Sequence, residues 1–216
     1  MTTITTAGLL FDSDGVLADS HHAASVAWNR WATTWAPSFD FHRDIVHGRR
    51  MEDTVAALVA LDDHAAAVVA IELLEMETLG EVIAMPGAVA LLSSLPDGVW
   101  TVVTSALNDL ARGRLAAAGL PLPAALVTAE DVTHGKPDPE PYRRGAALLG
   151  EAPRDCVVFE DAPAGIRAGL DAGVGTVIGI GAAALGTGAH FVVPDLRAIS
   201  YSNGMLHIDD SVRLDG

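Results

Sequence analysis

The sequence has little of three things: cysteine, basic residues and long apolar runs. Cys156 is its only cysteine, which excludes an intrachain disulfide and a cysteine-based metal site, and its apolar surroundings predict a buried, unreactive thiol. Lys and Arg number 13 against 28 Asp and Glu, which gives a net charge of -15. Such a protein repels nucleic acid and anionic membranes as a whole, so we expect neither as a partner. A small anion can still bind where a few cations converge.

No apolar run approaches the length of a membrane span, and the N-terminus lacks a basic segment followed by an apolar core and a cleavage site. We therefore expect a cytoplasmic protein. Its 216 residues are 50% hydrophobic, with a mean hydropathy of +0.33, enough to bury one core with a large insertion or two unequal domains. We expect a monomer or a weak homodimer.

The chain is organised around residues 9–20, where an apolar run ends in two carboxylates and a glycine. Residues 9–12 predict a buried strand. Gly15 allows a sharp turn, which aims Asp14 independently of Asp12. Acids at the carboxyl end of a strand lie where open α/β sheets bind ligands. The alternative is an ordinary strand-ending loop, because Asp and Gly are common turn residues.

Residues 20–85 show helical periodicity and no convincing strand. Within them, Trp28, Trp31 and Trp35 recur on one face of a predicted helix, a pattern more typical of core packing than of a substrate platform. From Gly87 onward, predicted strands at 100–103, 125–128, 156–159 and 176–180 alternate with helices, with short candidates at 191–193 and 206–208.

This order predicts an α/β fold: a Rossmann-like parallel sheet with helices on both faces and an inserted helical cap. We expect residues 1–19 and 86–216 to form the core and residues 20–85, the cap segment, to lie over the edge of the sheet where Asp12 and Asp14 stand.

Polar side chains follow several predicted strands, and parallel strands bring these ends to one edge of the sheet. There the carboxylates of Asp12, Glu160 and Asp161, with a backbone carbonyl near Asp14, form an oxygen-only set of the kind that Mg²⁺ prefers. Clustered acids repel one another unless a cation neutralises them or some are protonated. Lys136 supplies a further positive charge.

Taken together, Asp12-x-Asp14-Gly15-Val16, Ser105 after a second strand, Lys136 in Gly-Lys-Pro-Asp-Pro and Glu160-Asp161 in Val-Phe-Glu-Asp-Ala-Pro-Ala-Gly-Ile resemble the four motifs of the haloacid dehalogenase superfamily. The resemblance covers residues 9 to about 180. The subgroup with a helical cap between the first two motifs fits best, and its most similar members are phosphatases of small sugar and polyol phosphates, with beta-phosphoglucomutase a near relative.

The resemblance implies a role for each motif. Asp12 is the expected nucleophile, which forms an aspartyl-phosphate, and Asp14 the expected acid and then base. Lys136 and Mg²⁺ are expected to stabilise the transferring phosphoryl group. The Ser105 hydroxyl and the Ala106 backbone N–H are expected to hold its oxygens. The expected metal ligands are Asp12, Asp14, Glu160 and Asp161.

In the cap segment, His47-Gly48-Arg49-Arg50 resembles the specificity loop of the sugar-phosphate members. Arg49 or Arg50 can clamp a substrate oxygen, and one of them is expected to face solvent. His47 either binds a hydroxyl or is structural. Ala24 stands where the mutase carries a histidine used in acid and base chemistry, which weakens a mutase assignment.

We therefore expect a Mg²⁺-dependent phosphomonoesterase that hydrolyses a small sugar or polyol phosphate, a small phosphorylated metabolite being its partner. The alternatives are a phosphosugar mutase and a catalytically silent binding module on the same fold. Asp14 argues against a dehalogenase, since the dehalogenases lack this second aspartate.

Overall fold

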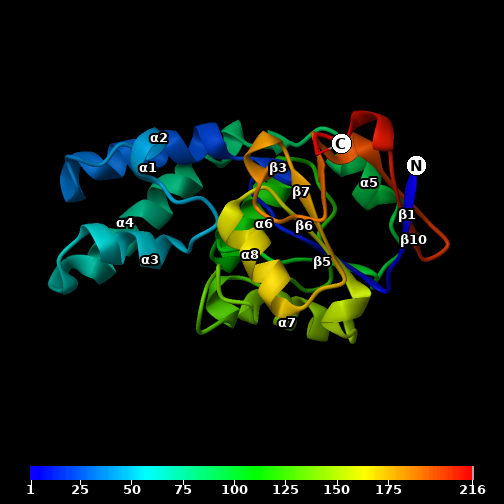
Figure 1. The fold of residues 1–216 in the computed structure, drawn as a ribbon. Helices are drawn as coiled ribbons and strands as arrows, with labels where there is room; N and C mark the ends of the chain where they lie inside the picture. The colour runs from blue at the N-terminus through cyan, green and yellow to red at the C-terminus, as the bar shows by residue number, and fades with distance from the viewer. Residues whose placement is uncertain (216) are drawn as a thin grey trace.

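The computed structural model describes residues 1–215 (Figure 1). It is built on a parallel sheet of order β5-β2-β6-β7-β8. Every residue of β2, β5, β6 and β7 is buried, as expected of a parallel sheet covered on both faces. The expected fold class is confirmed. The strands are β2 (Gly8–Phe11), β5 (Trp100–Val102), β6 (Cys156–Glu160), β7 (Thr176–Ile180) and β8 (Phe191–Val193).

Alternate residues of the strands supply two separate apolar layers. Leu9 and Phe11 of β2 belong to the layer that contains α5 (Ala88–Ser94) and α6 (Asn108–Ala117), as do Val102 and Phe159. Leu10 joins the opposite layer, which contains α7 (Glu140–Leu149) and α8 (Pro163–Ala172). Helices therefore cover both faces of the sheet, which leaves the strand ends as the place for polar chemistry.

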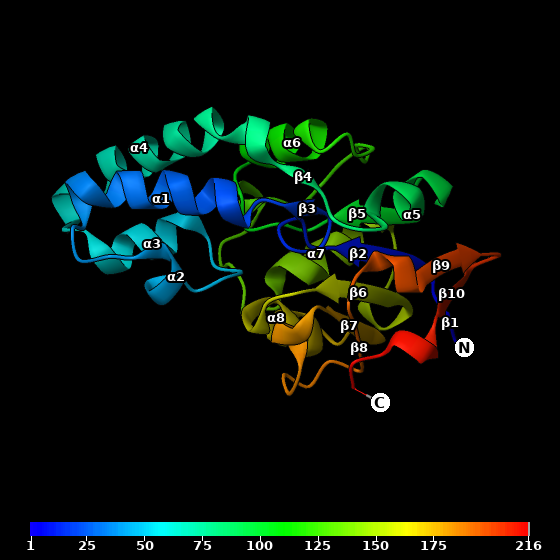
Figure 2. The ribbon, with the colours of Figure 1, turned by 90° about the horizontal axis from the view of Figure 1, so that it is seen from above.

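The cap segment is helical and extends to one side of the sheet (Figure 2). Its helices are α1 (His21–Trp35), α2 (Phe41–Asp44), α3 (Met51–Leu58) and α4 (His64–Glu77). Trp31 is 1% exposed, and its indole N–H donates to the Ala67 carbonyl of α4 at 2.8 Å. Trp28 lies against it with ring centroids 5.2 Å apart. These two tryptophans are packed as expected, whereas Trp35 is only half-buried.

The chain enters and leaves the cap segment through a small antiparallel ribbon of β3 (Ala18–Asp19) and β4 (Ile83–Ala84). The Met85 N–H extends the pairing with a bond to the Leu17 carbonyl at 2.8 Å. These two-residue strands escape prediction from sequence because they are too short for a pattern. They bring the two connections to the core side by side. The division at residues 19 and 86 itself stays a prediction.

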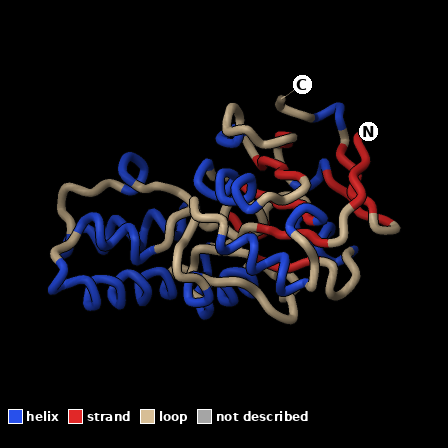
Figure 3. The backbone as a smooth tube through the Cα atoms, turned by 60° about the horizontal axis from the view of Figure 1, so that its bottom comes forward, coloured by secondary structure: helices blue, strands red, loops and turns tan. Residues whose placement is uncertain are grey.

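Two further parts of the chain differ from expectation. Residues 125–128 do not form a strand, and only one bridge joins Val103 to Val127, so that prediction was wrong. The weak alternation at 206–208 belongs to β10 (Met205–Ile208), which pairs with β1 (Thr2–Thr5) and β9 (Ile199–Ser202) in a separate antiparallel sheet. Figure 3 shows this sheet at the N-terminus of the chain.

Single turns of 3₁₀ helix connect many of these elements, at Leu61–Asp63, Leu79–Glu81, Ala129–Asp131, Pro153–Asp155, Ala182–Ala184, Leu196–Ala198 and Asp210–Val212. Among residues 1–215, no helix combines the length and apolar character needed to cross a bilayer. The polar strand ends at the sheet edge beside the cap segment are the part of the fold that bears on chemistry.

The packing of α1 on α4 yields a stability prediction. Trp31→Ala removes a fully buried indole and leaves the Ala67 carbonyl without its donor, so we expect the free energy of unfolding to fall by about 3–5 kcal/mol. Denaturant unfolding followed by circular dichroism measures this. Leu73→Ala on α4 is the control, because Leu73 is 60% exposed and its truncation should change little. Equal losses from the two substitutions would contradict the packing described.

Candidate active site

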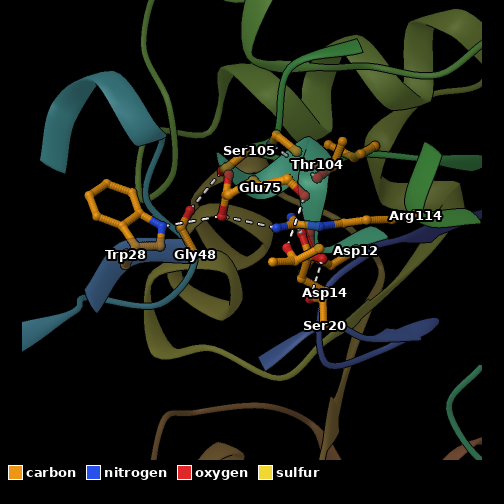
Figure 4. A network of polar contacts seen from close by, with 12 residues as sticks. Asp12, Asp14, Ser20, Trp28, Gly48, Glu75, Thr104, Ser105 and Arg114 are labelled. Atoms are coloured by element: carbon orange, nitrogen blue, oxygen red, sulfur yellow. Dashed lines mark hydrogen bonds and ion pairs between the residues drawn. The ribbon is translucent and has the colours of Figure 1, made fainter. Parts of the chain in front are cut away.

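The strand ends bring the predicted polar residues to one edge of the sheet (Figure 4). Asp12 directly follows β2, Glu160 ends the neighbouring strand β6, and Asp161 comes next in the chain. Thr104 and Ser105 lie beyond β5 on the other side of β2. Asp12 is 5% exposed and Glu160 fully buried. The parallel topology therefore gathers residues from three neighbouring strands.

Lys136 is the central cation of this edge. Its ammonium group donates to Asp12 Oδ1 at 2.6 Å, to Glu160 Oε1 at 2.7 Å and to the Val103 carbonyl at 3.0 Å. All three ammonium donors are thus used, and the side chain is 0% exposed. These three hydrogen bonds fix the ammonium group of Lys136 directly beside the carboxylate of Asp12.

Burial governs the ionisation of these groups. It raises the pKa of Asp12 to about 7, opposed by Lys136 and assisted by Glu160 and Asp14. Burial also raises the pKa of Asp161 well above its usual range, with Glu160 and Asp12 adding to the effect. It lowers the pKa of Lys136, but the adjacent carboxylates outweigh it and the net shift is upward. The one ammonium group of Lys136 therefore does not compensate the burial and mutual repulsion of these carboxyl groups.

The acids offer a set of hard oxygen ligands. One oxygen each from Asp12, Glu160 and Asp161 lie within 4.8 Å of one another. Three carboxylates beside one ammonium carry an uncompensated negative charge when ionised, which a divalent cation can neutralise. The residues present therefore fit a divalent metal ion of the Mg²⁺ type.

Glu160 already has donors on both of its oxygens. Oε1 accepts from Lys136 and from the Tyr142 hydroxyl at 2.8 Å, and Oε2 accepts from the Ala162 N–H at 3.1 Å. This carboxylate fixes the position of Lys136. Asp12 and Asp161 are consequently better placed than Glu160 to bind a cation directly.

Two glycines allow the backbone to approach these carboxylates. Gly15 has a φ of +81°, which favours glycine, and a Cβ atom there would overlap the Asp161 carboxylate. A Cβ atom at Gly165, at the start of α8, would overlap the carboxylate of Glu160. The first glycine thus brings the Asp12–Asp14 turn against Asp161, which could not be foreseen from either motif alone.

Ser105 connects the core to the cap segment. Its hydroxyl donates to the Gly48 carbonyl at 2.7 Å, while the Ala106 N–H donates to Thr104 Oγ1 at 3.1 Å. Both donors therefore have internal partners and both residues line the same cavity as Asp12. A bound anion can take over these donors, provided that it replaces the bonds that they make.

The loop at residues 47–50 places its two arginines differently. Arg49 is exposed and lines the cavity. Arg50 pairs with Asp53 at 2.9 and 3.0 Å and donates to the Thr133 carbonyl at 3.2 Å, so its guanidinium lies against the loop before Lys136. His47 also lines the cavity, 4.8 Å from His21 between ring centroids. Burial, and then His21, lower the pKa of His47.

A second polar chain begins at Asp14 and was missed by the sequence reasoning. Asp14 accepts from Ser20 at 2.5 Å and from Arg114 of α6 at 3.0 Å. Arg114 also donates to Glu75 of α4 at 3.0 Å, and Glu75 accepts from the Trp28 indole at 3.2 Å. Burial raises the pKa of Glu75, with Arg114 opposing it. Figure 4 shows this chain running from the core to the cap segment.

One cavity is lined both by acids of the Lys136 cluster and by the polar chain that begins at Asp14. Its lining combines core residues with residues of the cap segment, namely Asp12, Asp14, Ser105, Ala106, Leu110, Arg114 and Asp161 with Ser20, His21, Ala24, Trp28, Phe41, Ile45, Val46, His47, Gly48, Arg49, Met51, Thr54 and Glu75. A small anion in it would meet Arg49, the donors after β5 and the carboxylate of Asp12. Such a cavity suits an enzyme acting on a small phosphorylated molecule.

Comparison with known proteins agrees with this geometry. The family model for haloacid dehalogenase-like hydrolases matches residues 6–173. Hexitol phosphatase A of Escherichia coli is 43% identical over 171 residues, covering 77% of this chain and 79% of its own. Glycerol-1-phosphate phosphohydrolase 2 of Saccharomyces cerevisiae is 37% identical over 184 residues, covering 79% and 73%.

Solved structures share the fold. A hydrolase from Pseudomonas syringae superposes with a TM-score of 0.75 at 26% identity, covering 88% of this chain and 93% of its own. The beta-phosphoglucomutase of Clostridium difficile gives a TM-score of 0.76 at 21% identity, covering 88% and 92%, a likeness that concerns the fold alone. The sequence match across most of the chain and the shared fold lead to one assignment: this protein belongs to the haloacid dehalogenase-like hydrolase family.

Proposed function

We propose that this protein is a Mg²⁺-dependent phosphatase of small sugar or polyol phosphates. The observation that carries the proposal is the buried carboxylate of Asp12, held 2.6 Å from Lys136 on a cavity shared with the cap segment. Relatives named for hexitol and glycerol-1-phosphate hydrolysis support the substrate class. Phosphate release from a panel of hexitol, glycerol and sugar phosphates tests it.

In the first step, an oxygen of Asp12 attacks phosphorus and the bond from phosphorus to the ester oxygen breaks. Asp14, in its protonated form, gives its proton to the departing alkoxide, which leaves as an alcohol. Lys136 stays beside the reacting carboxylate, and its positive charge offsets the repulsion between two anions. The Ser105 hydroxyl and the Ala106 N–H hold phosphoryl oxygens.

In the second step, water attacks the phosphorus of the aspartyl-phosphate. The carboxylate of Asp14 takes a proton from that water, the bond between phosphorus and the Asp12 oxygen breaks, and phosphate leaves. Asp14 is thereby protonated again, ready for the next substrate. One carboxyl group thus serves as acid and then as base.

For the metal, we assign direct contacts to Asp12, Asp161 and the backbone carbonyl of Asp14, with Glu160 holding Lys136 in place. A bound Mg²⁺ would neutralise the excess negative charge and polarise phosphoryl oxygens. The chain contributes the closely spaced oxygens, which Gly15 makes possible by admitting the Asp161 carboxylate against the turn.

For the substrate, we assign recognition to the cap segment of residues 20–85, acting as a cap on the core formed by residues 1–19 and 86–216. Arg49 faces the cavity and can bind a substrate oxygen or phosphate with two donors, whereas Arg50 serves to anchor its loop. His47 stands where it can meet a substrate hydroxyl. The partner is a small phosphorylated metabolite.

Asp12→Asn is expected to lower turnover on the order of a million-fold, since an amide cannot replace the carboxylate nucleophile. The fold should persist, because the amide has nearly the same size. Phosphate release by the purified variant, alongside its circular dichroism spectrum, measures both. Asp97→Asn, at an exposed loop position, is the matched control and should retain full activity. Near-normal turnover of the Asp12 variant would refute the assignment.

Metal removal is expected to abolish activity, and Mg²⁺ should restore it, because the ligands are hard oxygens. Asp161→Asn should raise the Mg²⁺ concentration needed for half-maximal activity by at least about tenfold, the range in which outer-shell substitutions already act. Asp171→Asn, on the exposed end of α8, is the control. Full activity in excess chelator would disprove the metal assignment.

The product is expected to be free phosphate and not an isomerised sugar phosphate. The methyl group of Ala24 lines the cavity at the position where the resembling mutases offer an imidazole, so water should be the usual acceptor of the phosphoryl group. Incubation with a hexose 1-phosphate, followed for phosphate and hexose 6-phosphate together, decides between them. Mainly hexose 6-phosphate, stimulated by a bisphosphorylated sugar, would show a mutase instead.

A further inference from the structure

The chain from Asp14 to Trp28 contains an arginine that the proposed chemistry does not use. Arg114 is 6% exposed and lies on α6. The position of α6 is fixed by its buried apolar residues, which belong to the same apolar layer as residues of β2 and β5. One of its terminal nitrogens donates to Asp14 and the other to Glu75, each at 3.0 Å. A planar guanidinium with two engaged ends holds its partners in a defined direction, which a lysine cannot do.

We propose that Arg114 is a positioning residue for Asp14, and that Glu75 of the cap segment holds Arg114 in the orientation this requires. The inference rests on the proposed function, in which Asp14 gives and takes the proton. Both oxygens of Asp14 then have fixed partners, Ser20 on one and Arg114 on the other. Its carboxyl group is only partly buried and would otherwise rotate freely at the cavity wall.

Glu75 contributes the connection to the cap segment. It is 5% exposed, lies on α4, and its Oε1 accepts from both Arg114 and the Trp28 indole of α1. Two cap helices therefore fix one end of Arg114. A buried carboxylate and a buried guanidinium each need the other, because neither charge is stable alone in such a place. The placement of Asp14 in the core thus depends on the placement of α4.

The chemistry provides a test that separates positioning from simple structural support. An alkyl phosphate needs its leaving oxygen protonated, whereas p-nitrophenolate departs as a stable anion without a proton. Misplacing Asp14 should therefore slow the first step on an alkyl phosphate and spare the same step on p-nitrophenyl phosphate. Damage to the fold, to Asp12 or to the metal site would slow both substrates alike.

The experiment compares kcat/KM of the full-length protein with Mg²⁺ on glycerol phosphate or a hexitol phosphate and on p-nitrophenyl phosphate. Arg114→Met should lower the value on the alkyl phosphate about 100-fold, the cost of a misplaced catalytic group, and stay within about threefold on the nitrophenyl ester. Arg114→Lys should recover part of the loss, because it keeps the charge without the two-ended geometry. Glu75→Gln should show the same selective loss to a smaller degree, since its amide oxygen still accepts from Arg114.

Two matched controls accompany these variants. Arg112→Met is on the same helix, and Arg112 bonds only to Asn108 among side chains of the described residues. Glu77→Gln is on α4, where Glu77 is exposed and pairs with Arg30. Both should leave the two kcat/KM values unchanged. Thermal unfolding confirms that each variant is folded, and if Arg114→Met is not, the Lys and Gln variants carry the same comparison.

Equal losses on the two substrates, or no loss from Arg114→Met, would overturn the inference while leaving the proposed function intact. A wild-type protein that releases no phosphate from any alkyl phosphate would instead overturn the proposed function. Selective loss on the alkyl phosphate, with partial recovery in Arg114→Lys, supports the positioning role.

Discussion

The structure depends on a buried ammonium group placed between two carboxylates. Lys136 is the only lysine in the sequence, and its side chain is 0% exposed. Removing such a charge from water is costly unless its partners are close and correctly oriented. Asp12, Glu160 and the Val103 carbonyl meet that requirement from the ends of adjacent strands, and the Tyr142 hydroxyl orients Glu160 in turn. The order of strands, the loop that delivers Lys136 and the position of α7 are all constrained by this one group.

Much of the fold follows from local signals that the sequence carries strongly. Continuous apolar runs ending in acids predicted β2 and β6 at nearly their observed bounds, and parallel topology then predicted that Asp12, Glu160 and Asp161 would meet. The failures have physical causes. β1 reads Thr-Thr-Ile-Thr and gains its partner from residues about two hundred positions later, so nothing local marks it. Residues 125–128 have an apolar strand-like composition, yet the structure joins them to the sheet by a single bridge.

Only the part of the site that lies in sequence motifs could be predicted. The residues at the strand ends belong to recognisable local motifs, whereas Arg114 is 100 positions from Asp14 and 39 positions from Glu75 in the sequence. An arginine and a glutamate on a helix are usually solvated. Their burial here depends on how α4 packs on α6, which helical periodicity does not specify. Likewise, Arg49 and Arg50 are adjacent arginines whose roles the sequence does not distinguish. In the structure they differ because Arg50 pairs with Asp53 and donates to the carbonyl of Thr133.

The ion pairs of Arg114 would also affect the cost of any separation of the cap segment from the core. The segment is joined to the core by the β3–β4 ribbon. Its polar contacts with the core include Gly48 with Ser105, Glu75 with Arg114 and Arg50 with the Thr133 carbonyl. If α4 moves away, Glu75 gains water, which relieves the burial that raises its pKa. Arg114 keeps Asp14 as a partner, so no unpaired charge is left in the core. An arginine shared between two carboxylates would therefore make such a separation less costly than a single buried pair would, while the observed arrangement fixes all three side chains.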